Sequence, residues 1–330
     1  MVHPAVAALA VWSVLAGLLA LHSAWWAGRI LWGWNPQCGD EGQLQLERST
    51  SLVASVLGLG LAFQVLSVFL FIFTAEQLHG RFVGAMCAAG TLHVNGFGYP
   101  ALWLKLANCF LGGLWLVLNR ADTLGYDHPL IRVKYRLVLV LAPLLLLGEG
   151  LQVAYLAGLK ADVITSCCGS LFGQEAKGLV SELASLPWRT ALAALLGTTL
   201  LTAGTGIRFL RTGKGGYPFA AAGAVGVLVA AAALVSAVNL YVYELPTHHC
   251  PFCLLKSEYG FVGYGFYLLL LAGGVASLGL GATLPFRATP SLAEALPRLQ
   301  RRLGLAVVLA SAGFLLLSAA AIALSNLRLE

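Results

Sequence analysis

A short loop carries four side chains that can bind a soft metal ion or take part in redox chemistry. His248, His249, Cys250 and Cys253 belong to the sequence His-His-Cys-Pro-Phe-Cys, and apolar segments flank it on both sides. Two cysteines at this spacing can form a reversible disulfide, and they can equally supply two ligands of a zinc or copper site. A static disulfide or a structural metal half-site is the simpler alternative.

Pro251 predicts that a helix begins directly after Cys250, because proline fits the first turn of a helix, where its missing N–H is not needed. Cys250 would then lie at the N-cap, where the partial positive charge of a helix N-terminus stabilises a thiolate. A protonated His248 or His249 would lower the pKa of Cys250 further. We therefore expect Cys250 to exchange disulfides readily.

The rest of the chain is apolar enough to make this a loop of a membrane protein. Of 330 residues, 59% are hydrophobic and only 10% are charged, whereas soluble domains contain about 25% charged residues. A bilayer-spanning helix needs about 20 mostly apolar residues. We expect an all-α polytopic membrane protein, with a single transmembrane domain over 1–330 in contact with the lipid bilayer. The eight expected helices lie at approximately 4–26, 51–74, 100–118, 137–159, 188–207, 217–241, 261–283 and 304–324.

The distribution of basic residues predicts how the chain is oriented. The connections after helices one, three, five and seven contain about twice as many lysines and arginines as the other segments outside the helices. Basic residues are enriched in cytoplasmic connections, so we expect these connections to be cytoplasmic. We therefore expect an integral protein of the cell (inner) membrane. Both termini and the connections after helices two, four and six would lie on its extracytoplasmic side. The same distribution explains the net charge of +6 without a nucleic acid as partner.

This orientation places most of the seven cysteines outside, where disulfides can form and persist. The outer cysteines are Cys87 in the second connection, Cys167 and Cys168 in the fourth, and Cys250 and Cys253 in the sixth, with His93, His248 and His249 on the same side. Cys38 lies in a cytoplasmic connection and Cys109 within the third helix. We interpret both as unreactive thiols. We expect the three outer connections to bring their sulfur atoms together.

The adjacent residues Cys167 and Cys168 do not suit a disulfide with each other. Neighbouring cysteines can close a ring only by distorting the peptide between them, and such a bond is strained and easily reduced. We expect one of them to pair with a more distant cysteine such as Cys87, or both to bind a soft ion together. A structural disulfide to Cys87 with one spare thiol is the simpler alternative.

The sequence Cys250-Pro-Phe-Cys253-Leu-Leu-Lys256, at the outer end of a membrane helix, resembles the active-site motif of the disulfide bond formation protein B family. In arrangement it is similar to the vitamin K epoxide reductases. The resemblance implies that Cys250 and Cys253 exchange electrons with a second cysteine pair and pass them to a quinone. It also implies that Lys256 lies near the quinone and that an extracytoplasmic thioredoxin-like protein is a partner. The chain departs from these families, which have four or five helices and no adjacent cysteines in the second pair.

Glu149 is a second candidate, because a carboxylate within a membrane helix is costly and usually functional. It would carry protons for quinone chemistry or for a transported ion. The alternative is an ion pair with Lys105 that stabilises helix packing, since buried charges usually pair.

Three function classes remain open. The first is a membrane thiol–disulfide oxidoreductase that uses Cys250 and Cys253, with Cys87, Cys167 and Cys168 as a relay. The second is a metal-binding or transport protein, in which the same loops with His93, His248 and His249 bind Cu, Zn or Hg ions, because thiolates favour soft ions. The third is a membrane scaffold with structural disulfides. Phosphate-binding glycine loops, HExxH and Gly-x-Ser-x-Gly do not occur in the sequence.

Overall fold

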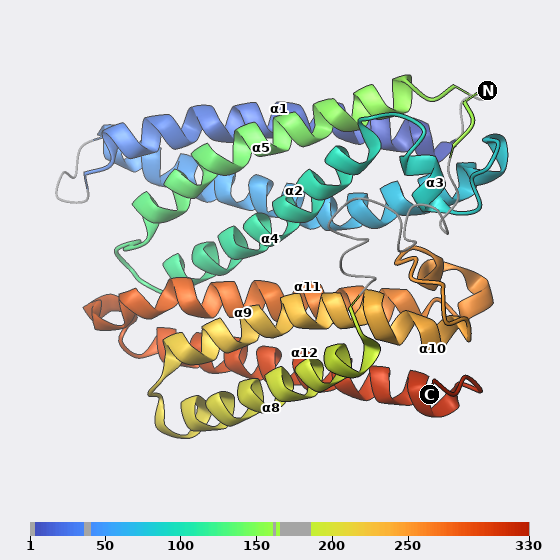
Figure 1. Ribbon diagram of the computed structural model, residues 1–330. Helices are drawn as coiled ribbons and strands as arrows, with labels where there is room; N and C mark the ends of the chain where they lie inside the picture. Colours follow the sequence, from blue (N-terminus) through green and yellow to red (C-terminus); the bar gives the residue numbers. More distant parts are fainter. Residues whose placement is uncertain (1–3, 36–40, 161–162, 166–185, 330) are drawn as a thin grey trace. The chain divides into compact units, whose positions relative to one another are not determined.

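The computed structural model describes residues 4–35, 41–160, 163–165 and 186–329 (Figure 1). It is 83% helical, and the described residues contain no strand, only an isolated bridge between Val83 and Ile164. Among the described residues, eight helices are long and apolar enough to cross a membrane. The expected all-α fold and the expected number of helices of this kind are therefore confirmed.

The described helices group into two compact units. The first unit contains most of α2 (Glu41–Leu78), together with α1 (Pro4–Gly33), α4 (Gly98–Asp122) and α5 (Ile131–Ala157). The helix α5 packs against both α1 and α4. The buried rings of Trp115 and Tyr135 satisfy their polar atoms within the core, each by donating a hydrogen bond of 3.1 Å to a backbone carbonyl.

The second unit is built on four long helices. These are α8 (Trp188–Thr212), α9 (Gly216–Ala233), α11 (Val262–Thr283) and α12 (Ala295–Leu324), and they run lengthwise beside one another in Figure 1. The helix α9 packs against both α8 and α11. Gly223 allows one close approach, because a Cβ atom there would lie 2.4 Å from Ser277 Oγ and 2.8 Å from a methyl group of Val307. Small residues serve helix packing in membranes in this way.

The sixth membrane span changes its helical geometry before it reaches the cysteine loop. After α9 the chain forms one π-helical segment, Leu234–Val238, and then the short helix α10 (Asn239–Tyr243). A π-helical turn leaves a carbonyl without its usual helical partner, and such turns occur frequently at functional sites. Here the carbonyl of Val235 is 2.9 Å from Nδ1 of His249.

Several helices extend beyond the apolar segments that predicted them. The helix α2 begins at Glu41, where the sequence suggested residue 51, and α12 begins at Ala295, where it suggested residue 304. The apolar segment measures only the thickness of the hydrocarbon layer, about 30 Å, whereas backbone hydrogen bonding continues into polar sequence. Large apolar side chains point outward along the helices, including Leu66, Leu228 and Leu316 with exposed fractions of 60%, 72% and 69%. Such a surface suits lipid contact.

The close packing at Gly223 yields a test of the second unit. The substitution Gly223→Ala is expected to lower the melting temperature in detergent, because overpacking costs about 1–3 kcal/mol. Gly197 in α8 is the matched control, since nothing lies within 4 Å of a Cβ atom at that position. Gly197→Ala should leave the melting temperature unchanged or raise it, because alanine favours helix over glycine. Equal effects at both positions would contradict the packing described.

Candidate functional site

Three cysteine sulfur atoms meet in the second unit. The Sγ atoms of Cys87, Cys250 and Cys253 all lie within 4.8 Å of one another, and those of Cys87 and Cys250 are 3.6 Å apart. Cys87 precedes the short helix α3 (Ala88–Leu92) and is 163 positions away from Cys250 in the chain. The expected convergence of the second and sixth connections is therefore confirmed. Cys38, Cys167 and Cys168 lie outside the described residues.

The three sulfur atoms are in two different redox states. Cys87 is disulfide-bonded, whereas Cys250, Cys253 and the helix residue Cys109 are free thiols. The distance of 3.6 Å between Cys87 and Cys250 far exceeds a covalent bond of about 2.05 Å. A dithiol thus lies in contact with a disulfide, which is the arrangement from which thiol–disulfide exchange begins.

Side chains of two helices hold the backbone around Cys250 in place. The carbonyl of Cys250 accepts hydrogen bonds from the Tyr243 hydroxyl at 2.6 Å and from the Asn239 amide at 3.2 Å. The same amide donates to the preceding carbonyl at 3.2 Å, and the hydroxyl of Tyr267 in α11 donates to the carbonyl of Pro251. Three successive carbonyls are therefore anchored, and this fixes the position of the Cys250 sulfur.

The prediction that Cys250 caps a helix is wrong. The first helical turn after it is the 3-10 helix Cys253–Leu255, whose N-cap is Phe252, and the long helix α11 begins only at Val262. The carbonyls of residues 249–251 accept hydrogen bonds from side chains and not from the backbone of a helix, and Pro251 lies in a bend. The reactivity of the cysteines must therefore come from their side-chain neighbours and not from a helix terminus.

The thiolate of the pair is Cys253 and not Cys250. The pKa of the Cys253 thiol is lowered to about 5, and the largest cause is the hydrogen bond from Cys250. Burial acts in the opposite direction but is outweighed. A hydrogen bond to His248 and the positive charge of Lys256 act in the same direction. The pKa of Cys250 is raised, first because its side chain is fully buried and then because Cys253 is beside it. The sequence had suggested the opposite assignment.

Glu76, near the end of α2, is the residue at this site that the sequence interpretation missed. Its Oε2 accepts a hydrogen bond of 2.7 Å from the backbone N–H of Ala88, next to Cys87. Its Oε1 is 3.1 Å from the ammonium group of Lys256. Burial lowers the pKa of Lys256, but the hydrogen bond and charge of Glu76 outweigh this and raise the pKa overall. The feature of the sequence that could have indicated Glu76 is an acidic residue at the end of an apolar segment, shortly before a cysteine.

The three candidate histidines occupy different environments. His248 forms a hydrogen bond with Cys253, and its ring lies edge-on to Tyr243 with centroids 4.5 Å apart. His249 binds the carbonyl of Val235 through Nδ1, and His93 is exposed at the end of α3. Within the part of the chain that the structure describes, the group with metal-ligand geometry consists of the three cysteines alone.

The described start of the fourth connection contacts the segment around Cys87. The backbone N–H of Thr165 donates to the carbonyl of Val83 at 2.9 Å, and its hydroxyl donates to that of Gly90 at 2.8 Å. Gly84 has φ of +88°, and a Cβ atom there would lie 2.2 Å from the Thr165 carbonyl oxygen. Only glycine suits both conditions. Thr165 stands two positions before Cys167 in the sequence.

Glu149 lies in the first unit and is paired. Its carboxylate is 3.0 Å from the ammonium group of Lys105, which is itself fully buried. It also accepts hydrogen bonds from Ser13, Gln64 and Gln152 at 2.8, 3.0 and 3.2 Å. An ionised carboxylate has about four acceptor positions, and here four donors fill them. The geometry favours the ion pair with Lys105 over a role as proton carrier.

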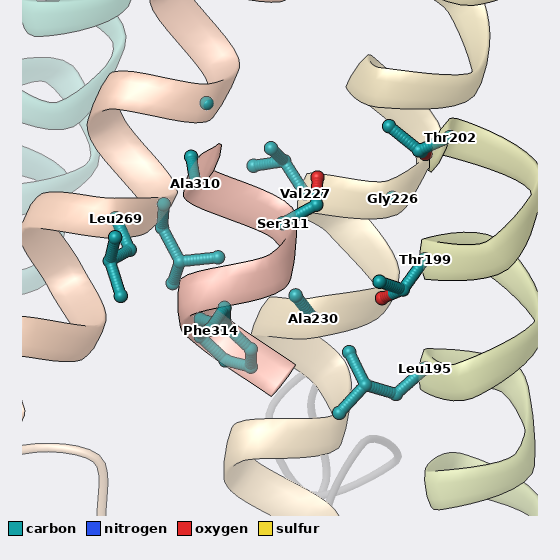
Figure 2. A pocket seen from close by; sticks show the side chains of 12 residues that line it. Leu195, Thr199, Thr202, Gly226, Val227, Ala230, Leu269, Ala310, Ser311 and Phe314 are labelled. Carbon is teal, nitrogen blue, oxygen red and sulfur yellow. The ribbon is translucent and has the colours of Figure 1, made fainter. Parts of the chain in front are cut away.

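A narrow pocket lies among the four long helices of the second unit (Figure 2). Its walls are mainly apolar, with the hydroxyl-bearing side chains of Thr199, Thr202 and Ser311 among them. Thr202 donates a hydrogen bond to the carbonyl of Ala222 at 3.2 Å. The pocket lining includes neither the cysteines nor Lys256, so the pocket is distinct from the cysteine site.

The environment of Cys253 predicts an unusual pH dependence. Alkylation of Cys253 by iodoacetamide, followed by mass spectrometry, should reach half its maximal rate near pH 5, because the thiolate forms above that pH. Cys250→Ala removes the hydrogen-bond donor and should move the midpoint to higher pH, whereas Cys250→Ser keeps an O–H donor and should move it less. A midpoint between pH 8 and 9 in the unmodified protein, as for an ordinary cysteine, would contradict this electrostatic description.

No family model, curated protein sequence or solved structure matches the chain. Its function is therefore inferred from its residues and their geometry.

Proposed function

We propose that the chain is a membrane thiol–disulfide oxidoreductase in which Cys250 and Cys253 exchange electrons with the disulfide of Cys87. The observation that carries this proposal is the distance of 3.6 Å between the Sγ atoms of Cys250 and Cys87. A free thiol, hydrogen-bonded to a thiolate that can take its proton, contacts a disulfide-bonded sulfur. Chemical exchange needs a thiolate, a disulfide and contact between them.

The first step transfers a proton and then exchanges one sulfur–sulfur bond. The Cys253 thiolate takes the proton of Cys250 through their hydrogen bond. The resulting Cys250 thiolate attacks Cys87, the bond between Cys87 and its partner breaks, and the partner leaves as a thiolate. The product is a mixed disulfide between Cys87 and Cys250.

The second step completes the transfer of two electrons. The proton that Cys253 took from Cys250 passes to water, and the Cys253 thiolate, which is stabilised by its hydrogen bond with His248, attacks Cys250. The mixed disulfide breaks and Cys87 leaves as a thiolate. Cys250 and Cys253 are then oxidised to a disulfide, and Cys87 and its partner are reduced. The reverse sequence moves electrons inward, and a quinone that accepts two electrons and two protons would then restore the Cys250–Cys253 disulfide.

Burial supports an exchange within the chain. Cys87 and Cys250 have no exposed surface, and Cys253 is only 7% exposed. A soluble thioredoxin-like partner would therefore act on the partner cysteine of Cys87 and not on Cys250. The disulfide of Cys87 supports an extracytoplasmic location for this end of the protein, since disulfides persist outside the cytoplasm. The distribution of lysine and arginine supports the same orientation.

A second candidate function is the binding of a soft metal ion. It is favoured by the mutual distances of at most 4.8 Å among the three sulfur atoms. Once the disulfide of Cys87 is reduced, three thiolates would face one position, as Cu(I), Zn(II) or Hg(II) requires. In the oxidised state Cys87 cannot supply a thiolate. Metal binding would therefore depend on the redox state of Cys87.

Trapping distinguishes the two functions. Cys253→Ala removes the thiol that resolves the mixed disulfide and also the base of the first step. A Cys87–Cys250 linkage should therefore accumulate at alkaline pH, where Cys250 ionises without Cys253, and appear in non-reducing peptide maps. Cys109→Ala, at a buried cysteine outside the cluster, is the control and should give no new linkage. Metal binding predicts instead that no linkage forms and that a chelator increases the alkylation of the reduced thiols. That second pattern would exclude the proposed exchange.

We expect the partner of Cys87 to be Cys167 or Cys168. Thr165, shortly before them, contacts the segment around Cys87. Cys38 instead lies in a connection that the distribution of lysine and arginine predicts to be cytoplasmic, on the side of the membrane opposite to Cys87. Non-reducing peptide mapping of the unmodified protein should show the expected linkage. A bond between Cys87 and Cys38 would contradict the proposed relay.

A further inference from the structure

We infer that Glu76 is a positioning residue for the exchange and keeps the Cys87 sulfur in contact with the Cys250 sulfur. This inference rests on the proposed oxidoreductase function and adds to it a residue outside both cysteine motifs. It is drawn from a single carboxylate whose two oxygen atoms serve two different loops.

The first loop is held on both sides of Cys87. Glu76 Oε2 accepts the N–H of Ala88 at 2.7 Å, directly after the cysteine. The ammonium group of Lys256 donates to the carbonyl of Met86 at 3.1 Å, directly before it. Cys87 therefore stands between two fixed backbone groups, and its side chain has little freedom to move away from the neighbouring thiols.

The second loop is tied to the first by the ion pair. Glu76 Oε1 lies 3.1 Å from Lys256 Nζ and 3.5 Å from Nδ1 of His79, and Lys256 follows Cys253 by three positions. The side chains of Glu76 and Lys256 are only 16% and 20% exposed, so water screens the pair less than it screens a surface ion pair. Removing the carboxylate would release both the N–H of Ala88 and the ammonium group of Lys256.

Glu76 also affects the charge at the reacting sulfurs. It fixes the ammonium group of Lys256, whose positive charge is one of the influences that lower the pKa of Cys253. A residue that only stabilised the fold would leave that pKa unchanged. A positioning residue should change both the rate of sulfur exchange and the pH at which Cys253 becomes reactive.

The test measures how fast the Cys87–Cys250 linkage forms in the full-length Cys253→Ala protein, at one alkaline pH at which Cys250 ionises without Cys253. Glu76→Ala should slow this formation about tenfold or more, because it removes two charge-assisted hydrogen bonds. Glu76→Gln keeps an acceptor for the N–H of Ala88 but loses the charge. Its rate of linkage formation should therefore lie between the rate with Glu76 intact and the rate of Glu76→Ala. Glu244→Ala is the matched control, since this carboxylate also accepts two hydrogen bonds in the second unit, both from Asn326. It should leave the rate unchanged.

A second readout uses the protein with all its cysteines. Glu76→Gln should shift the alkylation midpoint of Cys253 to lower pH, because Lys256 keeps its hydrogen bond to Met86 while the negative charge that offsets its positive charge is lost. An unchanged linkage rate in Glu76→Gln and Glu76→Ala, with an unchanged midpoint, would overturn the role of Glu76 alone. Absence of the linkage while Glu76 is intact would instead overturn the proposed exchange. If Glu76→Ala does not fold, the Glu76→Gln result decides.

Discussion

The contact between the sulfur atoms of Cys87 and Cys250, at 3.6 Å, is the constraint on which the rest of the site depends. Sulfur exchange requires that the attacking atom reach the disulfide, so the loops must be held to within a fraction of an ångström. On one side, Asn239 and Tyr243 anchor the carbonyl of Cys250. On the other, the Glu76–Lys256 pair holds the residues flanking Cys87. The membrane helices supply the rigid ends from which these side chains act.

The two units use their polar residues differently. In the first unit, the buried charges of Glu149 and Lys105 are satisfied by each other and by neighbouring amides and hydroxyls. Such a network stabilises helix packing, because an unpaired charge in a membrane is very costly. In the second unit, the cysteine site lies in the connections between helices, where a thiol and a thiolate share one proton between Cys250 and Cys253. Reactivity there comes from proton sharing and not from an unsatisfied group.

Hydropathy was sufficient to predict the eight helices, because each membrane span must be apolar over the whole hydrocarbon thickness. The sequence also predicted that Cys87 would meet Cys250 and Cys253, from their common side of the membrane. It could not identify the thiolate, because that depends on which sulfur faces His248 and Lys256 after folding. The helix cap expected from Pro251 does not form, because Tyr243 in α10 and Tyr267 in α11 donate hydrogen bonds to the carbonyls of Cys250 and Pro251. The spacing of the motif alone does not predict these contacts from the helices on either side of it.

The most direct measurement follows both disulfides in one purified protein over time. The protein is prepared with Cys87 oxidised and with Cys250 and Cys253 reduced, and it is kept without oxygen, quinone or other oxidant. Isotope-coded alkylation then quantifies each thiol. We predict that a Cys250–Cys253 disulfide appears at the same rate as the disulfide of Cys87 disappears, independently of protein concentration. If the two cysteine pairs keep their initial states, or exchange only between molecules, the account is contradicted.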